Sequence, residues 1–295
     1  MNEDVWIPAR DGYKLAGTCF QPGAHANGVV ILINAATAVP RGFYAAFAQY
    51  CCAQGYIVVT YDYRGIGGSR PYSLRGFEVR ARDWALLDMA SVLDWVSDTF
   101  EPRQLFLVGH SFGGQTAGLL PNSKWVAGMV TLSSQSGYWR MQGGAQKAAV
   151  AFHVNITFPV LVKLFGFLPW SKFGSAEDLP KGVALEWAGW CRRPGYLMDD
   201  ETLPLERYQE FQAPVLAYSI DDDDWGSARS VDAMMSAYPI LERRHVVPET
   251  YGLKSIGHFG FFRSKSEKLW VEVLAWFDGL RRDEGSNMIQ SGVGK

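Results

Sequence analysis

The sequence predicts an α/β fold, with a mostly parallel central sheet and helices on both of its faces. Three observations lead to this prediction. Short apolar runs alternate along the chain with longer segments of helical periodicity, the order expected when helices connect parallel strands. Most of these runs are apolar without interruption, as in strands that are buried on both faces. One of them, Leu105–Val108, ends in a turn of small residues around Ser111.

Eight segments have the composition expected of strands. The first two flank the pair Asp11-Gly12, which is typical of the turn in a hairpin. Most of the later ones are rich in Val, Ile and Leu, which suit a buried strand. In chain order, the predicted strands are Val5–Pro8, Lys14–Phe20, Gly28–Ile33, Tyr56–Tyr61, Leu105–Val108, Met129–Ser133, Val215–Ile220 and Arg244–Val247.

Five further segments predict helices. Gly55 ends the first, because glycine is common immediately after a helix. In the second, Leu86, Ala90, Leu93 and Val96 fall on one face. The third leaves the turn around Ser111. In chain order, the predicted helices are Phe43–Gln54, Ala81–Asp98, Gly113–Leu120, Ser227–Ala237 and Ser264–Leu280.

The segment 135–211 breaks this alternation. It is rich in Trp, Phe, Pro and Gly and lies between two predicted strands. We expect it to form a helical cap over the carboxyl edge of the sheet, where open α/β sheets bind ligands. Residues 1–134 and 212–280 then form the core. Residues 281–295, in which Gly, Ser, Asn and Gln dominate, are expected to form a mobile tail.

Composition excludes several classes of partner. The net charge of −2 gives no basic field for nucleic acid, so no nucleic-acid partner is expected. The four cysteines show no metal-ligand spacing, which favours reduced thiols and no metal site. The first residues lack the basic and apolar regions of a signal peptide. We therefore expect a cytoplasmic protein, and the sequence indicates no oligomeric state.

The most apolar region of the chain is Ala148–Trp170. His153, Asn155, Lys163, two prolines and a glycine interrupt it. A spanning helix needs about 20 mostly apolar residues without charge. We therefore expect an amphipathic helix over a pocket, and association with the surface of a membrane is the less favoured alternative.

The turn Gly109-His110-Ser111-Phe112-Gly113 has the spacing of a nucleophile elbow. In such a turn a strand bends sharply into a helix and holds the serine with its Oγ exposed. Glycine is needed at the flanking positions because a Cβ would strike the neighbouring strand or helix. A serine hydroxyl is a weak nucleophile, so this chemistry also needs a general base and a carboxylate to orient it.

The sequence offers candidates for both partners. His258 lies in a loop after the last predicted strand, at the same sheet edge as Ser111, which favours it over the other four histidines. Asp221–Asp224 follow the strand Val215–Ile220, and all four qualify by residue type. Consecutive carboxylates point in diverging directions, so a calcium site is not expected there.

Several motifs together resemble the α/β-hydrolase superfamily. The elbow resembles its nucleophile turn, Asp62–Ser69 resembles its D-x-R-G-x-G-x-S stretch, and Gly257–Gly260 resembles its histidine loop. The chain order of serine, acid and histidine is also that of the superfamily. Within it, the sequence is most similar to poorly characterised bacterial predicted hydrolases, grouped with serine-aminopeptidase-like and monoacylglycerol-lipase-like sequences.

The resemblance implies an α/β-hydrolase fold and assigns roles to residues. Ser111, Asp223 and His258 would be catalytic. Related sequences place the acid three residues beyond a glycine, which is Ile220 here, so Asp223 is preferred and Asp222 is its rival. The backbone amides of Phe112 and of Ala36, or of a residue one position from Ala36, would form the oxyanion hole, although Asn34–Ala38 replaces the usual His-Gly pair. Asp62 and Arg64 are expected to be a pair that stabilises a turn.

These features predict a serine hydrolase that cleaves an ester or related acyl compound of small or medium size and apolar character, without a cofactor. An acyltransferase, an amidase or peptidase, and a C–C bond hydrolase could use the same residues, and so could a ligand-binding protein without turnover. Four tryptophans of the insertion have two interpretations: they line a pocket, or they pack the insertion itself. These residues are Trp139, Trp170, Trp187 and Trp190.

Overall fold

A computed structural model describes residues 2–172, 174 and 176–291. Its main sheet has eight strands in the order β1-β2-β4-β3-β5-β6-β9-β10. The pairs β1–β2 and β2–β4 are antiparallel, and every other pair is parallel. The strands are β1 (Asn2–Pro8), β2 (Lys14–Phe20), β3 (Val29–Asn34), β4 (Ile57–Tyr61), β5 (Gln104–His110), β6 (Val126–Leu132), β9 (Val215–Ile220) and β10 (Leu241–Val246). The predicted α/β class and mostly parallel sheet are confirmed.

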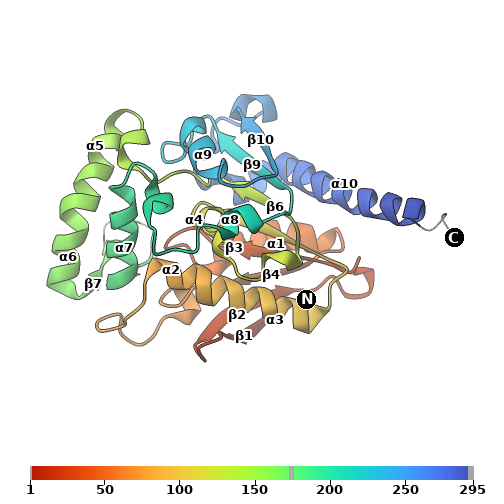
Figure 1. Cartoon of the computed structure of the whole chain (residues 1–295), viewed down its shortest axis with the longest axis horizontal. Helices are drawn as coiled ribbons and strands as arrows, with labels where there is room; N and C mark the ends of the chain where they lie inside the picture. Colours follow the sequence, from red (N-terminus) through yellow and green to blue (C-terminus); the bar gives the residue numbers. More distant parts are fainter. Residues whose placement is uncertain (1, 173, 175, 292–295) are drawn as a thin grey trace.

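Helices cover both faces of this sheet (Figure 1). On β6, a Cβ at Gly128 would lie 2.6 Å from Leu280 Cδ1 of α10. Thr131 on the same strand donates from its hydroxyl to Met235 Sδ of α9, at 3.4 Å. Because side chains alternate along a strand, positions 128 and 131 face opposite sides, and so do α10 and α9. The helices of the core are α1 (Ala45–Ala53), α2 (Ala81–Asp83), the π-helix η4 (Trp84–Met89), α3 (Ala90–Phe100), α4 (Phe112–Gln115), α9 (Ala228–Met235) and α10 (Glu267–Ser291).

Short 3₁₀ helices connect these elements. They are η1 (Gly23–His25), η2 (Arg41–Tyr44), η3 (Gly67–Ser69), η5 (Ala117–Leu119), η6 (Ser123–Trp125), η7 (Trp139–Met141), η9 (Trp170–Lys172), η10 (Tyr196–Asp199), η11 (Pro248–Tyr251), η12 (Gly260–Phe262) and η13 (Ser264–Ser266).

Two helices differ from their predicted extent. The expected helix 113–120 is only the four-residue α4 followed by η5. Glycine weakens a helix, and the amide of Gly118 donates to the Tyr238 hydroxyl at 2.8 Å. At the other end of the chain, α10 continues to Ser291, so residues 281–291 of the expected tail are helical. The rest of that tail, 292–295, lies outside the described residues.

Residues 135–211 connect β6 to β9, which pair directly in the sheet. The segment therefore leaves the sheet and returns to the neighbouring strand, as an insertion does. Its helices α5, α6 and α7 stand together beside the core in Figure 1. Apart from the 3₁₀ turns given above, its elements are α5 (Gly144–Phe152), the π-helix η8 (His153–Thr157), α6 (Phe158–Phe165), the ribbon β7 (Phe167–Leu168) with β8 (Leu179–Pro180), α7 (Lys181–Cys191) and α8 (Arg207–Glu210).

Polar contacts fix the insertion to the core. Arg82 donates to Glu186 of α7 from its backbone amide and from Nε, at 2.9 and 2.6 Å. The amide of Gly67 donates to Glu177 at 2.7 Å. The cap is thus held against the loops that follow β4.

Asp62 and Arg64 do not form the expected pair. Asp62 pairs instead with Arg41, at 2.5 Å, and accepts the amide of Gly68 at 2.8 Å. Arg64 pairs with Asp88 at 2.7 Å and with Asp11 at 2.6 Å. Both side chains stabilise the turn after β4, but their partners come from distant parts of the sequence.

Candidate active site

Ser111 sits where β5 bends into α4. Its backbone has φ 49° and ψ −113°, a conformation that a non-glycine residue adopts only under constraint from its surroundings. A Cβ on Gly109 would lie 2.5 Å from Gly114 Cα, and one on Gly113 would lie 2.2 Å from the Asn34 carbonyl oxygen. The two glycines are therefore required by close packing, as the spacing predicted.

His258 and Asp223 lie side by side at the same edge of the sheet. His258 Nδ1 is 2.8 Å from one Asp223 carboxylate oxygen and 3.1 Å from the other. A carboxylate only accepts, so the Nδ1 nitrogen carries the proton and Nε2 is left with its lone pair. Asp223 also accepts the amides of Trp225 and Gly226, at 2.8 and 2.9 Å.

The side chain of Asp223 is fully buried, whereas 8% of the His258 side-chain surface is exposed. Burial by itself raises the pKa of Asp223, but the hydrogen bond and charge of His258, the Ser133 side chain and the amide of Trp225 together outweigh it. The net pKa of Asp223 is lowered, so the carboxylate stays ionised beside the imidazole.

Asp222, the rival acid, has a different role. One of its carboxylate oxygens accepts the amide of Ile256 and the other accepts the amide of Gly257, both at 2.9 Å. It therefore fixes the backbone immediately before His258 and does not contact the imidazole. Asp221 is exposed and lies 3.3 Å from His245 Nε2.

His110, inside the elbow itself, joins three parts of the site through hydrogen bonds. Its Nε2 lies 2.9 Å from the His258 carbonyl oxygen, which can only accept, so Nε2 carries the proton. Nδ1 must then accept from the Tyr44 hydroxyl, at 3.0 Å. The hydroxyl oxygen in turn accepts the amide of Ala36, at 2.8 Å. Sequence reasoning missed this chain, because nothing in the spacing brings Tyr44 to His110.

Burial lowers the pKa of His110 to about 3, and the nearby His258 adds to the effect. His110 is therefore neutral at ordinary pH, as its role as acceptor from Tyr44 requires. The imidazole acts as a fixed link between the loop after β3 and the loop that carries His258.

This chain of bonds contradicts the prediction for Ala36. An amide has one hydrogen, and that of Ala36 is already donated to the Tyr44 hydroxyl. Ala36 and the next residue, Thr37, both line the pocket with Ser111 and His258, so the amide of Thr37 is the alternative donor. The other predicted donor, Phe112, is the first residue of α4, whose amide has no acceptor within the helix.

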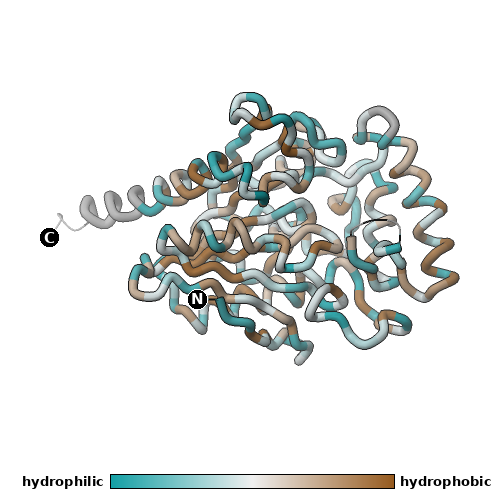
Figure 2. The backbone as a smooth tube through the Cα atoms, turned by 180° about the vertical axis from the view of Figure 1, so that it is seen from behind, coloured by the Kyte–Doolittle hydropathy of each residue, from teal (hydrophilic) through white to brown (hydrophobic). Residues whose placement is uncertain are grey.

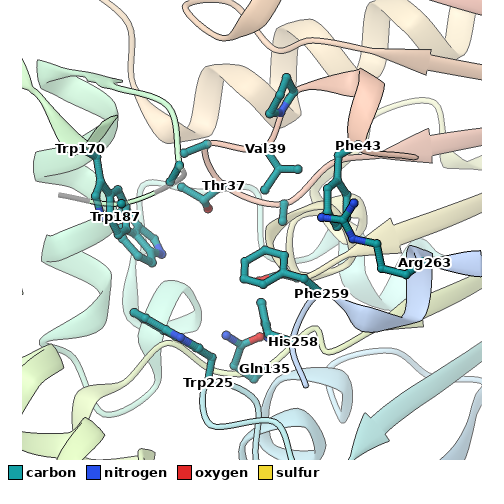
Figure 3. A pocket seen from close by; sticks show the side chains of 16 residues that line it. Thr37, Val39, Phe43, Gln135, Trp170, Trp187, Trp225, His258, Phe259 and Arg263 are labelled. Carbon is teal, nitrogen blue, oxygen red and sulfur yellow. The ribbon is translucent and has the colours of Figure 1, made fainter. Parts of the chain in front are cut away.

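One pocket of about 600 Å³ opens beside Ser111, whose exposed fraction is 8%. Figure 3 shows Trp170 and Trp187 of the cap on one side and Phe259 and His258 of the core on the other. Arg263 is the charged side chain at its rim and lies over the Phe43 ring, 4.5 Å from the centroid. The remaining lining residues are Ala36, Thr37, Ala38, Val39, Pro40, Gln135, Gly174, Ala176 and Trp225.

The four tryptophans singled out from the sequence divide between the two interpretations. Trp170 and Trp187 line the pocket. Trp190 is buried in the cap, where its indole nitrogen donates to Asp200 at 2.8 Å, and Trp139 packs against the buried hydrophobic cluster of the molecule. Among the described residues, no group of three or more His, Cys, Asp or Glu side chains is arranged to hold a metal ion.

Comparison with protein families gives one match. The sequence matches the model of the Alpha/beta hydrolase family over residues 30–267, which is most of the chain. None of the curated proteins with which the sequence was compared matches it.

Solved structures resemble the whole chain at low identity. An esterase from Exiguobacterium antarcticum has a TM-score of 0.61 at 16% identity, covering 93% of this chain and 99% of its own. A thermophilic esterase from Thermogutta terrifontis has a TM-score of 0.59 at 16% identity, covering 94% and 99%. An alpha-beta serine hydrolase homologue from Coxiella burnetii has a TM-score of 0.55 at 14% identity, covering 92% and 96%. At these identities the likeness shows the fold alone.

Proposed function

Because the chain belongs to the Alpha/beta hydrolase family, we propose that it is a serine hydrolase that cleaves an ester or a related acyl compound. The observation that carries this proposal is the arrangement around the pocket. Ser111 is held in a strained elbow, His258 lines the same pocket, and the buried carboxylate of Asp223 orients His258 at 2.8 Å.

In the proposed reaction, Ser111 Oγ attacks the acyl carbon while its proton passes to His258 Nε2. The tetrahedral intermediate collapses, and the leaving group departs with that proton, which leaves an acyl-enzyme on Ser111. Water then attacks the acyl carbon, again giving its proton to His258, and the acid is released with Ser111 restored. Asp223 stabilises the imidazolium in both steps without being protonated.

Within the described residues, no hydrogen bond joins the Ser111 hydroxyl to His258. Such bonds are often long before substrate binds and shorten in the complex. We propose that the amides of Phe112 and Thr37 receive the oxyanion. Donors of this kind each contribute about 3–4 kcal/mol to transition-state stabilisation.

The pocket supports an acyl substrate of apolar character. Its volume of about 600 Å³ suits a small or medium molecule, and most of its lining is apolar. The family chemistry proposed here needs no cofactor, because the nucleophile, the base and the oxyanion donors are all supplied by the chain. The esterases that share the fold are consistent with this class of substrate but do not identify it.

Labelling with a fluorophosphonate tests the proposal. The wild-type protein should form an adduct on Ser111 and hydrolyse p-nitrophenyl esters, with an optimum of acyl chain length set by the pocket. Ser111→Ala should lose both activities while keeping its circular dichroism spectrum. A folded wild-type protein that forms no adduct on Ser111 would overturn the proposal. Alcohol, thiol and amine acceptors added to the ester assay would show whether water is the acceptor.

A further inference from the structure

The outer rim of the cap is one continuous helix from Gly144 to Phe165, made of α5, η8 and α6. Within it, Gln146–Phe165 is long and apolar enough to cross a membrane, judged by length and composition alone. Only 22% of its most apolar stretch is buried inside the fold, so it is not a core helix. Figure 2 shows its hydrophobic residues at the edge of the molecule.

This helix has two apolar faces, each with one residue every four positions. The inner face is buried in the cap and consists of Val150, Val154, Phe158 and Val162. The apolar residues of the exposed outer face are Phe152 (55% exposed), Ile156 (50%), Val160 (48%) and Leu164 (67%). The polar side chains of His153, Asn155 and Lys163, which lie between them in the sequence, are exposed too. At 1.5 Å per residue, the outer stripe is about 18 Å long. Exposed apolar stripes of this kind mark interaction surfaces.

The inner face supports the wall of the active-site pocket from behind, through Phe158. The Phe158 ring packs on Trp170 and on Trp187, with centroids 5.4 and 5.8 Å apart. A helix that crossed a membrane would have to leave these partners and expose the pocket. The structure therefore favours a helix that lies on a surface with its inner face still packed.

The charge around the stripe selects the kind of surface. Residues 136–176 contain no Asp or Glu, although the whole chain has 30 acidic residues and 28 basic ones. The same segment carries Arg140, Lys147, Lys163 and Lys172, all of them exposed. An apolar stripe among basic side chains matches the interfacial region and headgroups of an anionic bilayer.

We propose that the outer face of the Gly144–Phe165 helix docks on an anionic lipid surface. Phe152, Ile156, Val160 and Leu164 enter the interfacial region, and Lys147 and Lys163 contact the headgroups. This proposal takes the alternative that the sequence analysis favoured less, in which the surface of the protein associates with a membrane. It does not rest on the proposed hydrolase function. If the docking proposal and the hydrolase proposal are both correct, the wall of the active-site pocket lies about one helix diameter, about 10–12 Å, from the bilayer.

Vesicle co-sedimentation of the full chain tests the proposal, with phosphatidylcholine vesicles and with vesicles that also contain phosphatidylglycerol. The wild type should bind the anionic vesicles, and binding should weaken with salt. Ile156→Gln with Val160→Gln should weaken binding at least about tenfold. Lys147→Gln with Lys163→Gln should weaken binding to anionic vesicles about 30-fold. Val271→Gln, on α10 and 53% exposed, is the matched control and should bind as the wild type does.

The circular dichroism spectrum should be unchanged in all of these variants, which shows that they fold whether or not the protein hydrolyses esters. Vesicle binding should persist in Ser111→Ala, so a failure of the hydrolase proposal does not affect this test. Three results would overturn the docking proposal. The first is that the wild type does not bind the vesicles, and the second is that the wild type and the Ile156/Val160 variant bind equally. The third is a wild-type dimer that this variant converts to a monomer, because that result would assign the outer stripe to contact with a second copy of the chain.

Discussion

Replacing His110 with glutamine should change how the stability of the protein depends on pH. In the folded protein, burial lowers the His110 pKa to about 3, whereas an unfolded histidine titrates near 6.5. The folded state therefore binds its proton less readily than the unfolded state does. The contribution of neutral His110 to the free energy of unfolding is complete above about pH 6.5, and it is lost progressively as the pH falls towards 3.

The magnitude follows from these two pKa values. A pH of 5 lies about 1.5 units below the pKa of the histidine in the unfolded chain, which is therefore mostly protonated. In the folded protein His110 is still neutral at this pH. At about 1.36 kcal/mol per unit, His110 makes the fold about 2 kcal/mol less stable at pH 5 than at pH 7. Other buried groups also titrate, and burial raises the pKa of Asp88 to about 7. The informative quantity is therefore the difference between the wild type and His110→Gln.

Urea unfolding, followed by tryptophan fluorescence at pH 7 and at pH 5, measures this difference. His110→Gln should be less stable than the wild type at pH 7, because it disturbs two buried hydrogen bonds worth about 1–3 kcal/mol. That gap should shrink by about 2 kcal/mol at pH 5. A gap that is the same at both pH values would show that His110 is not held neutral by burial.

Three further substitutions test other parts of the site. Asp223→Asn should lower kcat for a soluble ester about 10⁴-fold, because the amide favours the wrong tautomer of His258, and wild-type turnover by this variant would contradict the assignment. Asp222→Ala should lower kcat about 10- to 100-fold, because the backbone before His258 loses its two hydrogen bonds to the carboxylate. Ser111 of this variant should still react with a fluorophosphonate, and complete loss of labelling would argue against a positioning role for Asp222. Gly113→Ala should unfold the protein or destabilise it by more than about 3 kcal/mol, because the new Cβ meets the Asn34 carbonyl, and a folded variant of wild-type melting temperature would refute that argument.

Most of the fold could be predicted because its strands are local and strongly apolar. Each of the eight predicted strands overlaps an observed one, and the insertion lies between neighbouring strands as expected. The third predicted helix is shorter than expected, because the glycine-rich backbone after Ser111 bonds to a distant tyrosine instead of continuing as an α-helix. The partners of Asp62 and Arg64 were wrong, since both come from remote segments that no local pattern identifies.

The candidate site could be predicted in outline from order and spacing. Three chemistry-bearing side chains follow three parallel strands, whose carboxyl ends share an edge, so they had to lie near one another. The choice of Asp223 over Asp222 depends on loop geometry, because adjacent carboxylates point in different directions. The donor at Ala36 could not be judged from the sequence, because its amide bonds to the side chain of Tyr44. The catalytic roles themselves stay predictions.

Local sequence patterns do not show which parts of the chain pack together, and for this reason the exposed outer stripe of the cap could not be predicted from the sequence. Residues 150, 154, 158 and 162 and residues 152, 156, 160 and 164 follow the same four-residue spacing, and both sets are apolar. A sequence pattern indicates that such a helix has two faces to cover but not which one the rest of the chain covers. The structure buries the first set inside the cap and exposes the second. Four exposed apolar side chains on a segment without acidic residues are the reason for which we propose a partner outside the chain, and an anionic bilayer matches both their apolar surface and the basic charge of the segment.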